Sequence, residues 1–139
     1  MITDSNGNLY VGGDFDTAGG VEAKNVAKWD GHRWIPLSSG MNAAVNSLCF
    51  DKDGNLYAGG DFVVASGDFA LFVAKWDGTE WSTVDSGLPY PVKTLVSDNQ
   101  GNLYALLKDN FGIVKWDGIS WKQIALFDGI AINTINVNE

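Results

Sequence analysis

A short motif that occurs three times constrains this chain more than any other feature. It reads KWDGHRW at residues 28–34, KWDGTEW at 75–81 and KWDGISW at 115–121. All six tryptophans of the 139 residues lie in these three copies. A motif that returns in tandem predicts a repeat architecture, in which each copy is one supersecondary unit packed on its neighbours.

A second motif, DxxGNLY, sets the period of the repeat. Its copies begin at Asp4, Asp51 and Asp98, so consecutive copies are 47 residues apart. The first two KWDG motifs keep this spacing of 47, whereas the third follows the second after only 40 residues. The third repeat therefore has a deletion of seven residues between its LY strand and its KW strand.

The residue pattern of each repeat predicts four short β-strands. In the second repeat these are residues 45–51, 55–62, 71–76 and 80–84, with Asp77-Gly78 as a type I′ turn between the last two. No 3.6-residue period competes, so we expect no helix. Four strands in each tandem unit are typical of a β-propeller blade, and a solenoid of hairpins is the alternative. The predicted fold class is all-β, with three four-stranded antiparallel blades.

The repeats predict one propeller segment, with blades at about residues 1–44, 45–91 and 92–131. Closed propellers have about 4–8 blades, so three blades leave two apolar faces open. Residues 132–138 align with 92–98, the first strand of the third repeat. We expect this spare strand to complete the first blade of a second copy, in a head-to-tail homodimer of six blades. The residues expected to form this oligomer strand are Ile132, Thr134, Ile135 and Val137.

Composition excludes several partners. The net charge of −8 argues against nucleic acid, which needs clustered lysine and arginine. No apolar run of about 20 residues predicts membrane insertion, and no signal peptide is recognisable. Cys49 is the single cysteine and lies in an apolar strand pattern, which indicates an inert core thiol.

Chemistry-bearing patterns are sparse, so we expect neither an enzyme nor a cofactor. Asp51, Asp53 and Asn55 resemble the start of a calcium loop, but the EF-hand positions of Gly and Glu are not matched. A strand-connecting turn is the preferred interpretation, with a cation site as the weaker alternative. His32 is the single histidine and lies beside a turn, so no nucleophile–histidine pair is supported.

Loops that differ between the repeats are the better candidates for binding. Such loops on a repeated scaffold are where ligand contacts usually lie. A lectin-like function, with aromatic side chains and Asp/Asn pairs holding a glycan, is the alternative to a protein-binding scaffold. The candidate loop residues are Asp16, Glu22, Asn42, Asp68, Tyr90 and Asp128.

The first repeat, read as LYVGGDF, KWDGHRW and PLSSGM, resembles kelch-type propeller blades. It is most similar to bacterial tandem repeats of the form GNLYVGGxF…AKWDGxxW. That resemblance implies a propeller and favours an extracellular or cell-surface protein, with the chain as a fragment of a longer secreted repeat protein as a further alternative. Copy three departs from the pattern, because Leu106-Leu107-Lys108 replaces Gly-Gly-Asp.

The tryptophan pairs themselves have two interpretations. On the strand pattern, Trp29 and Trp34 share one face of a hairpin, as do the pairs of the other repeats. The pairs form either a repeated ligand site or a repeated joint between blades. We expect the joint, because each pair would cover the face on which a neighbouring blade packs.

Overall fold

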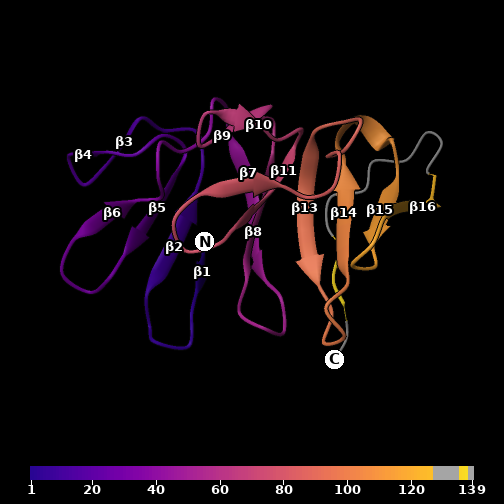
Figure 1. Cartoon of the computed structure of the whole chain (residues 1–139), viewed down its shortest axis with the longest axis horizontal. Coiled ribbons are helices and arrows are strands. Elements are labelled where there is room, and N and C mark those ends of the chain that lie inside the picture. The colour runs from indigo at the N-terminus through magenta and orange to yellow at the C-terminus, as the bar shows by residue number, and fades with distance from the viewer. Residues whose placement is uncertain (127–134, 138–139) are drawn as a thin grey trace.

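The computed structural model describes residues 1–126 and 135–137. Residues 2–125 contain three four-stranded antiparallel sheets side by side (Figure 1). The first sheet has the order β1 (Ile2–Thr3), β2 (Leu9–Gly12), β5 (Val26–Trp29) and β6 (Trp34–Pro36). The second consists of β7 (Val45–Phe50), β8 (Leu56–Gly60), β11 (Val73–Trp76) and β12 (Trp81–Thr83). The third consists of β13 (Val92–Ser97), β14 (Leu103–Leu107), β15 (Ile113–Trp116) and β16 (Trp121–Ala125). The all-β prediction is confirmed, and we call these sheets blades 1, 2 and 3.

The loops between the second and third strands of blades 1 and 2 are more ordered than the sequence indicated. Each contains a small hairpin, formed by β3 (Thr17–Ala18) with β4 (Val21–Glu22) and by β9 (Val64–Ala65) with β10 (Asp68–Phe69). We expected plain loops there. Positive φ angles at Gly19, Gly20 and Gly67 supply the tight reversals that polar loop sequence alone did not predict.

The third blade lacks such a hairpin, because the predicted seven-residue deletion shortens the loop between its second and third strands. Its β14 and β15 are joined by η1, a 3₁₀ turn at Lys108–Asn110, which is the one helical element of the described residues. Asp109 inside it has φ 56°, a left-handed conformation that costs energy for a residue other than glycine. No helix in the described part of the chain is long and apolar enough to cross a membrane.

The prediction of a type I′ turn at Asp77-Gly78 was wrong. In blade 2 the paired Trp76 and Trp81 are separated by four residues, and only Gly78 has a positive φ, of 103°. The carboxylate of Asp77 instead accepts hydrogen bonds from the backbone N–H groups of Thr79 and Glu80, both at 2.8 Å. Aspartate serves here as a side-chain cap of a wider turn rather than as a left-handed turn residue.

The innermost strands β7 and β13 lie side by side and connect blades 2 and 3. Ser47 accepts a hydrogen bond from the backbone N–H of Leu95 at 2.9 Å, and its hydroxyl donates to the Leu95 carbonyl at 3.1 Å. A Cβ added to Gly59 of β8 would lie only 2.6 Å from Val92 of β13. The GG sequence therefore allows the next inner strand to approach closely, which is a specific structural use of glycine.

Two apolar clusters fill the joints between the blades. The first lies between blades 1 and 2 and includes Tyr10, Val26, Leu48 and Trp81. The second lies between blades 2 and 3 and includes Tyr57, Val73 and Leu95. Each blade thus has two apolar faces, and blade 2 has both of them covered.

Gly60 makes a second close approach, to the segment just before the inner strand β7 of its own blade, and substitution by alanine tests it. The new methyl group would overlap the backbone carbonyl oxygen of Ala44, which cannot move away without displacing the inner strand. We expect Gly60→Ala to lower the free energy of unfolding by about 1–3 kcal/mol in denaturant titrations.

Gly13, the equivalent glycine of blade 1, provides a matched control. Its added Cβ would meet the Phe15 ring at 3.1 Å, and that side chain is partly exposed and free to adjust. We expect Gly13→Ala to change stability by much less. Equal losses in the two variants would contradict the role assigned to the close approach at Gly60.

Candidate functional site

The tryptophan pairs have nearly the same geometry in all three blades. The rings of Trp29 and Trp34 have centroids 5.6 Å apart, and those of Trp76 and Trp81 are 5.3 Å apart. The pair in blade 3 is again separated by 5.6 Å. In each case the two residues are direct partners in the strand ladder. The hairpin therefore presents a fixed double-ring surface on one face of each blade.

Two of the three pairs are packed in joints, as expected. Trp81 is only 2% exposed and belongs to the cluster between blades 1 and 2, on which Trp76 also packs. Trp116 and Trp121 pack on the cluster between blades 2 and 3. The indole N–H of Trp121 also donates to the carbonyl of Val84 on the preceding blade, at 3.3 Å.

A tyrosine and a lysine of the preceding blade form the other side of each joint. Tyr10 and Lys28 line the same hollow as Trp76, and Tyr57 and Lys75 line the same hollow as Trp116. The lysine Nζ lies 5.5 Å from the centroid of the Tyr10 ring in blade 1 and 5.7 Å from that of Tyr57 in blade 2. We call this tyrosine–lysine surface the receiving face of a blade.

The receiving face of blade 3 holds no tryptophan. Lys115 lies over Tyr104 at 5.6 Å, as in the other two blades. These residues border a hollow of about 580 Å³ that is also lined by Val96 and Ile113. The C-terminal residues Ile135 and Val137 line it too. The hollow occupies the place that a following blade fills in the two joints of this chain.

The opposite end of the chain presents the complementary surface. Trp29 and Trp34 lie on the face of blade 1 that points away from blade 2, and both are partly exposed. They belong to neither of the two clusters. At one end of the three blades, the pair Trp29–Trp34 therefore has no receiving face. At the other end, the receiving face of blade 3 has no tryptophan pair.

Blade 3 differs from the others near the innermost strand. Leu106 stands at the position of Gly59 and is 1% exposed, so the space that receives Val92 in the preceding joint is filled by a side chain. Lys108 replaces the aspartate of copies one and two. The departure of copy three from the repeat pattern therefore changes the contacts at this edge of blade 3.

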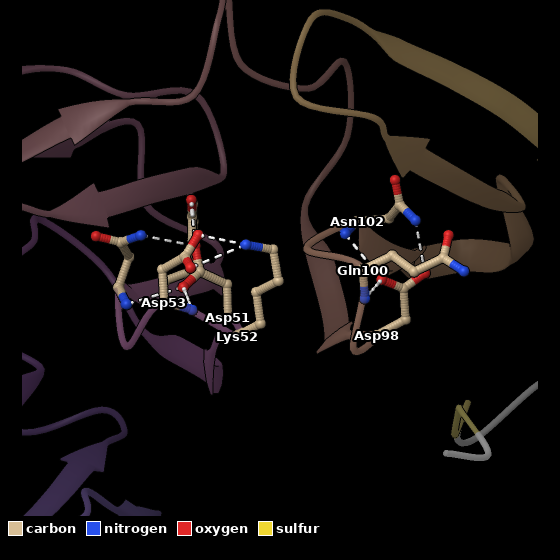
Figure 2. A network of polar contacts seen from close by, with 8 residues as sticks. Asp51, Lys52, Asp53, Asp98, Gln100 and Asn102 are labelled. Carbon is tan, nitrogen blue, oxygen red and sulfur yellow. Dashed lines mark hydrogen bonds and ion pairs between the residues drawn. The ribbon is translucent and has the colours of Figure 1, made fainter.

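The acidic turns are held by hydrogen bonds within the turn. One carboxylate oxygen of Asp51 accepts from the backbone N–H groups of Asp53 and Asn55, both at 2.9 Å. The other accepts from the Asn55 amide at 2.8 Å and from the Tyr57 hydroxyl at 3.2 Å. Figure 2 shows the equivalent turn of Asp98 in the neighbouring blade, with the same pattern of bonds. The side chain of Asp53 points outward to Lys52, at 2.8 Å (Figure 2).

This arrangement lowers the pKa of the turn aspartate. Partial burial acts to raise the pKa of Asp51, but the hydrogen bonds from Asn55, Asp53 and Tyr57 outweigh it and bring the pKa below its ordinary value of 3.8. Among the described residues, no group of three or more His, Cys, Asp or Glu side chains could hold a metal ion. Burial raises the pKa of the Cys49 thiol to about 12, so it stays protonated at neutral pH.

The candidate loop residues that the structure describes belong to loops along one edge of the blades, on the side opposite the acidic turns (Figure 1). Asp16, Glu22 and Asp68 are exposed and lie in or beside the loop hairpins. Asn42 is structural in part, because its side-chain oxygen accepts from the backbone N–H groups of Val63 and Val64. Asp128, Ile132 and Thr134 lie outside the described residues.

Two features of this edge were not expected from the sequence. Tyr90 stacks on Phe111, with ring centroids 3.6 Å apart, and both rings remain about two-fifths exposed. The Lys108 ammonium lies 2.7 Å from the carboxylate of Asp61 on the preceding blade. The sequence signal for this ion pair was the lysine at a position where the other repeats have aspartate.

The family comparison agrees with the fold. The family model described as the Rax2 C-terminal beta propeller domain matches residues 1–139, so the chain belongs to this family of β-propeller domains. The predicted resemblance to propeller blades is thereby confirmed at the level of the fold, and the closer resemblance to bacterial kelch-like repeats stays a prediction. No curated protein and no solved structure matched the chain.

The lowered pKa of Asp51 predicts a stability change in acid. A carboxylate with a depressed pKa in the folded state adds stability above its unfolded pKa, and loses it as the pH falls through the folded value. We therefore expect the melting temperature to fall below about pH 4, where the unfolded chain binds protons first. Asp51→Asn should be less stable at neutral pH and should show a flatter curve in acid.

Asp53→Asn serves as the control, because the Asp53 carboxylate points away from the turn. We expect it to keep both the neutral stability and the acid slope of the unchanged chain. An Asp51→Asn variant with an unaltered acid slope would show that this turn does not carry the pH dependence.

Proposed function

We propose that this chain is a non-catalytic propeller scaffold that binds through the open faces of its end blades, with a second copy as its first partner. In this arrangement Trp29 and Trp34 of one copy pack against Tyr104 and Lys115 of the other. If the contact closes after two steps, the two copies form a six-bladed ring. The contact is head-to-tail, because two different surfaces meet.

The observation that supports this proposal most is the match between the receiving face of blade 3, which holds no tryptophan, and the two receiving faces that do. The same Tyr–Lys contact lies beside Trp76 in one joint and beside Trp116 in the other. At Tyr104 and Lys115 the contact is present, and a hollow stands where the tryptophan would be. Trp29 is the one tryptophan at this repeat position that has no receiving face within the described chain.

Burial of the exposed pair supplies the driving force. Aromatic side chains bury roughly 150–250 Å² each and contribute strongly to interfaces. At about 25 cal/mol per Å² of apolar area, a joint formed around two such rings gains several kcal/mol before the cost of association is subtracted. Two joints form per ring, so the second closes without a further loss of translational freedom.

The C-terminal segment is compatible with the same arrangement. Ile135 and Val137 lie beside Val96 and Tyr104, on the face where a following blade would place its innermost strand. The residues at 132–138 align with such a strand. In a longer chain, the next blade of that chain would occupy the same face, which is the alternative of a fragment from a longer secreted repeat protein.

A lectin-like function is the second candidate and rests on the loop edge. The stacked rings of Tyr90 and Phe111 offer an exposed aromatic surface next to polar loops. Aromatic surfaces of this kind stack on the apolar faces of sugars as well as on peptide side chains. Binding of Tyr90→Ala to a glycan array, compared with the unchanged chain, distinguishes this candidate from the scaffold.

Light scattering during size-exclusion chromatography tests the scaffold proposal. The chain has a mass of 15.0 kDa, and we expect about twice this value at high micromolar concentration. Trp29→Ala and Tyr104→Ala should each shift the equilibrium toward monomer, because each removes one side of the joint.

Tyr90→Ala is the control for a lost aromatic side chain, because Tyr90 lies on the loop edge and not on an open face. It should leave the mass unchanged. A wild-type chain that stays monomeric across the whole concentration range would refute the homodimer.

A further inference from the structure

One position at the inner edge of the loops distinguishes the third blade from the first two. Asp14, Asp61 and Lys108 are 47 residues apart, and each lies just after the second strand of its blade. The backbone N–H of Asp61 donates to Ala44 at 2.9 Å, and that of Lys108 donates to Pro91 at 2.8 Å. Because Ala44 and Pro91 are themselves 47 residues apart, Asp61 and Lys108 hold the same structural position. We call it the rim position.

The joint between blades 2 and 3 shows that neighbouring rim positions are within reach of each other. The Lys108 ammonium contacts both carboxylate oxygens of Asp61, at 2.7 and 2.8 Å. The Asn46 amide donates to Asp61 at 3.2 Å and to the Val92 carbonyl at 2.8 Å, which ties the ion pair to both inner strands. The two charged side chains are only about one-third exposed.

The rim of blade 1 has the opposite character. Asp14 is exposed, and no hydrogen bond or ion pair joins its carboxylate to another residue in the described ranges. The rim position of the neighbouring blade 2 is also an aspartate, Asp61, and Lys108 is already paired with it. The open end of blade 1 therefore presents a carboxylate, whereas the lysine at the rim of blade 3 is held by Asp61 of blade 2.

We propose that Lys108 bridges its own Asp61 and Asp14 of a second copy, and that this bridge selects the head-to-tail order of the two chains. The inference rests on the proposed pairing and adds the residues that determine its specificity. Contact between two first blades would bring two Asp14 carboxylates together, and contact between two third blades would bring two lysines together. Like charges at either contact disfavour those orders, so the rim acts against the wrong pairings.

Two charge reversals give a sharp test, because each is harmful alone and they rescue each other. Asp14→Lys places two lysines at both joints of a homodimer, and Lys108→Asp places two aspartates there. A mixed dimer of the two variants restores one lysine–aspartate pair at each joint. We expect each variant to dimerise about fivefold to 25-fold more weakly than the wild type, in the range for exposed ion pairs at two joints.

The mixture should recover dimer affinity close to that of the wild type, and native mass spectrometry should show the heterodimer as the dominant species. Asp16→Lys makes the same charge change two residues from the rim, and it should dimerise as the wild type does. Lys108→Asp also removes the pair with Asp61, so circular dichroism of both variants must first show a folded chain.

The outcomes separate this inference from the proposal beneath it. A monomeric wild type refutes the homodimer and the rim bridge together. A dimeric wild type with unchanged affinity in Asp14→Lys, or a mixture with no excess of heterodimer, refutes the rim bridge and leaves the head-to-tail pairing in place. Strong weakening by the control Asp16→Lys would show that overall charge, rather than the rim contact, controls association.

Discussion

The packing of a tryptophan pair from one blade on the tyrosine and lysine of the blade before it is the contact on which the rest of the structure depends. An isolated four-stranded sheet of this length has two apolar faces and no interior of its own, so its strands gain stability only when both faces are covered. The repeated hairpin places its two rings opposite each other, and the preceding blade supplies a flat surface with a cation at its edge. Both internal joints of the chain are variations of this one contact.

The other repeated elements serve to position that contact. The acidic turn fixes the start of the second strand and orients its tyrosine, since Tyr57 donates its hydroxyl to the same aspartate that closes the turn. The glycines at the end of this strand let the next inner strand approach, which sets the spacing between the blades. The aspartate of KWDG caps the hairpin that carries the rings. Each conspicuous residue of the repeat therefore contributes to one joint rather than to a separate site.

Much of this could be predicted from the sequence, because the three repeats can be aligned and compared with one another. Three copies of KWDGxxW predicted that Trp29 and Trp34 share one face of a hairpin, and the shorter third repeat located the shortened loop between β14 and β15. The failures have a physical basis as well. The turn after Trp76 was mistaken for a two-residue turn because Asp-Gly satisfies two turn types, and only the side-chain bonds of Asp77 distinguish them. The stacking of Tyr90 on Phe111 joins loops of different origin, and no repeat pattern encodes such a contact.

The central claim is that the exposed tryptophans of blade 1 are the unfilled half of a joint. Fluorine NMR of the chain labelled with 5-fluorotryptophan tests it directly, because each of the six rings gives its own signal. On dilution through the micromolar range, the signals of Trp29 and Trp34 should shift toward solvent-exposed positions, whereas those of Trp76, Trp81 and Trp121 should stay constant. Signals of Trp29 and Trp34 that do not change with concentration, while the chain remains a monomer throughout, would contradict the account.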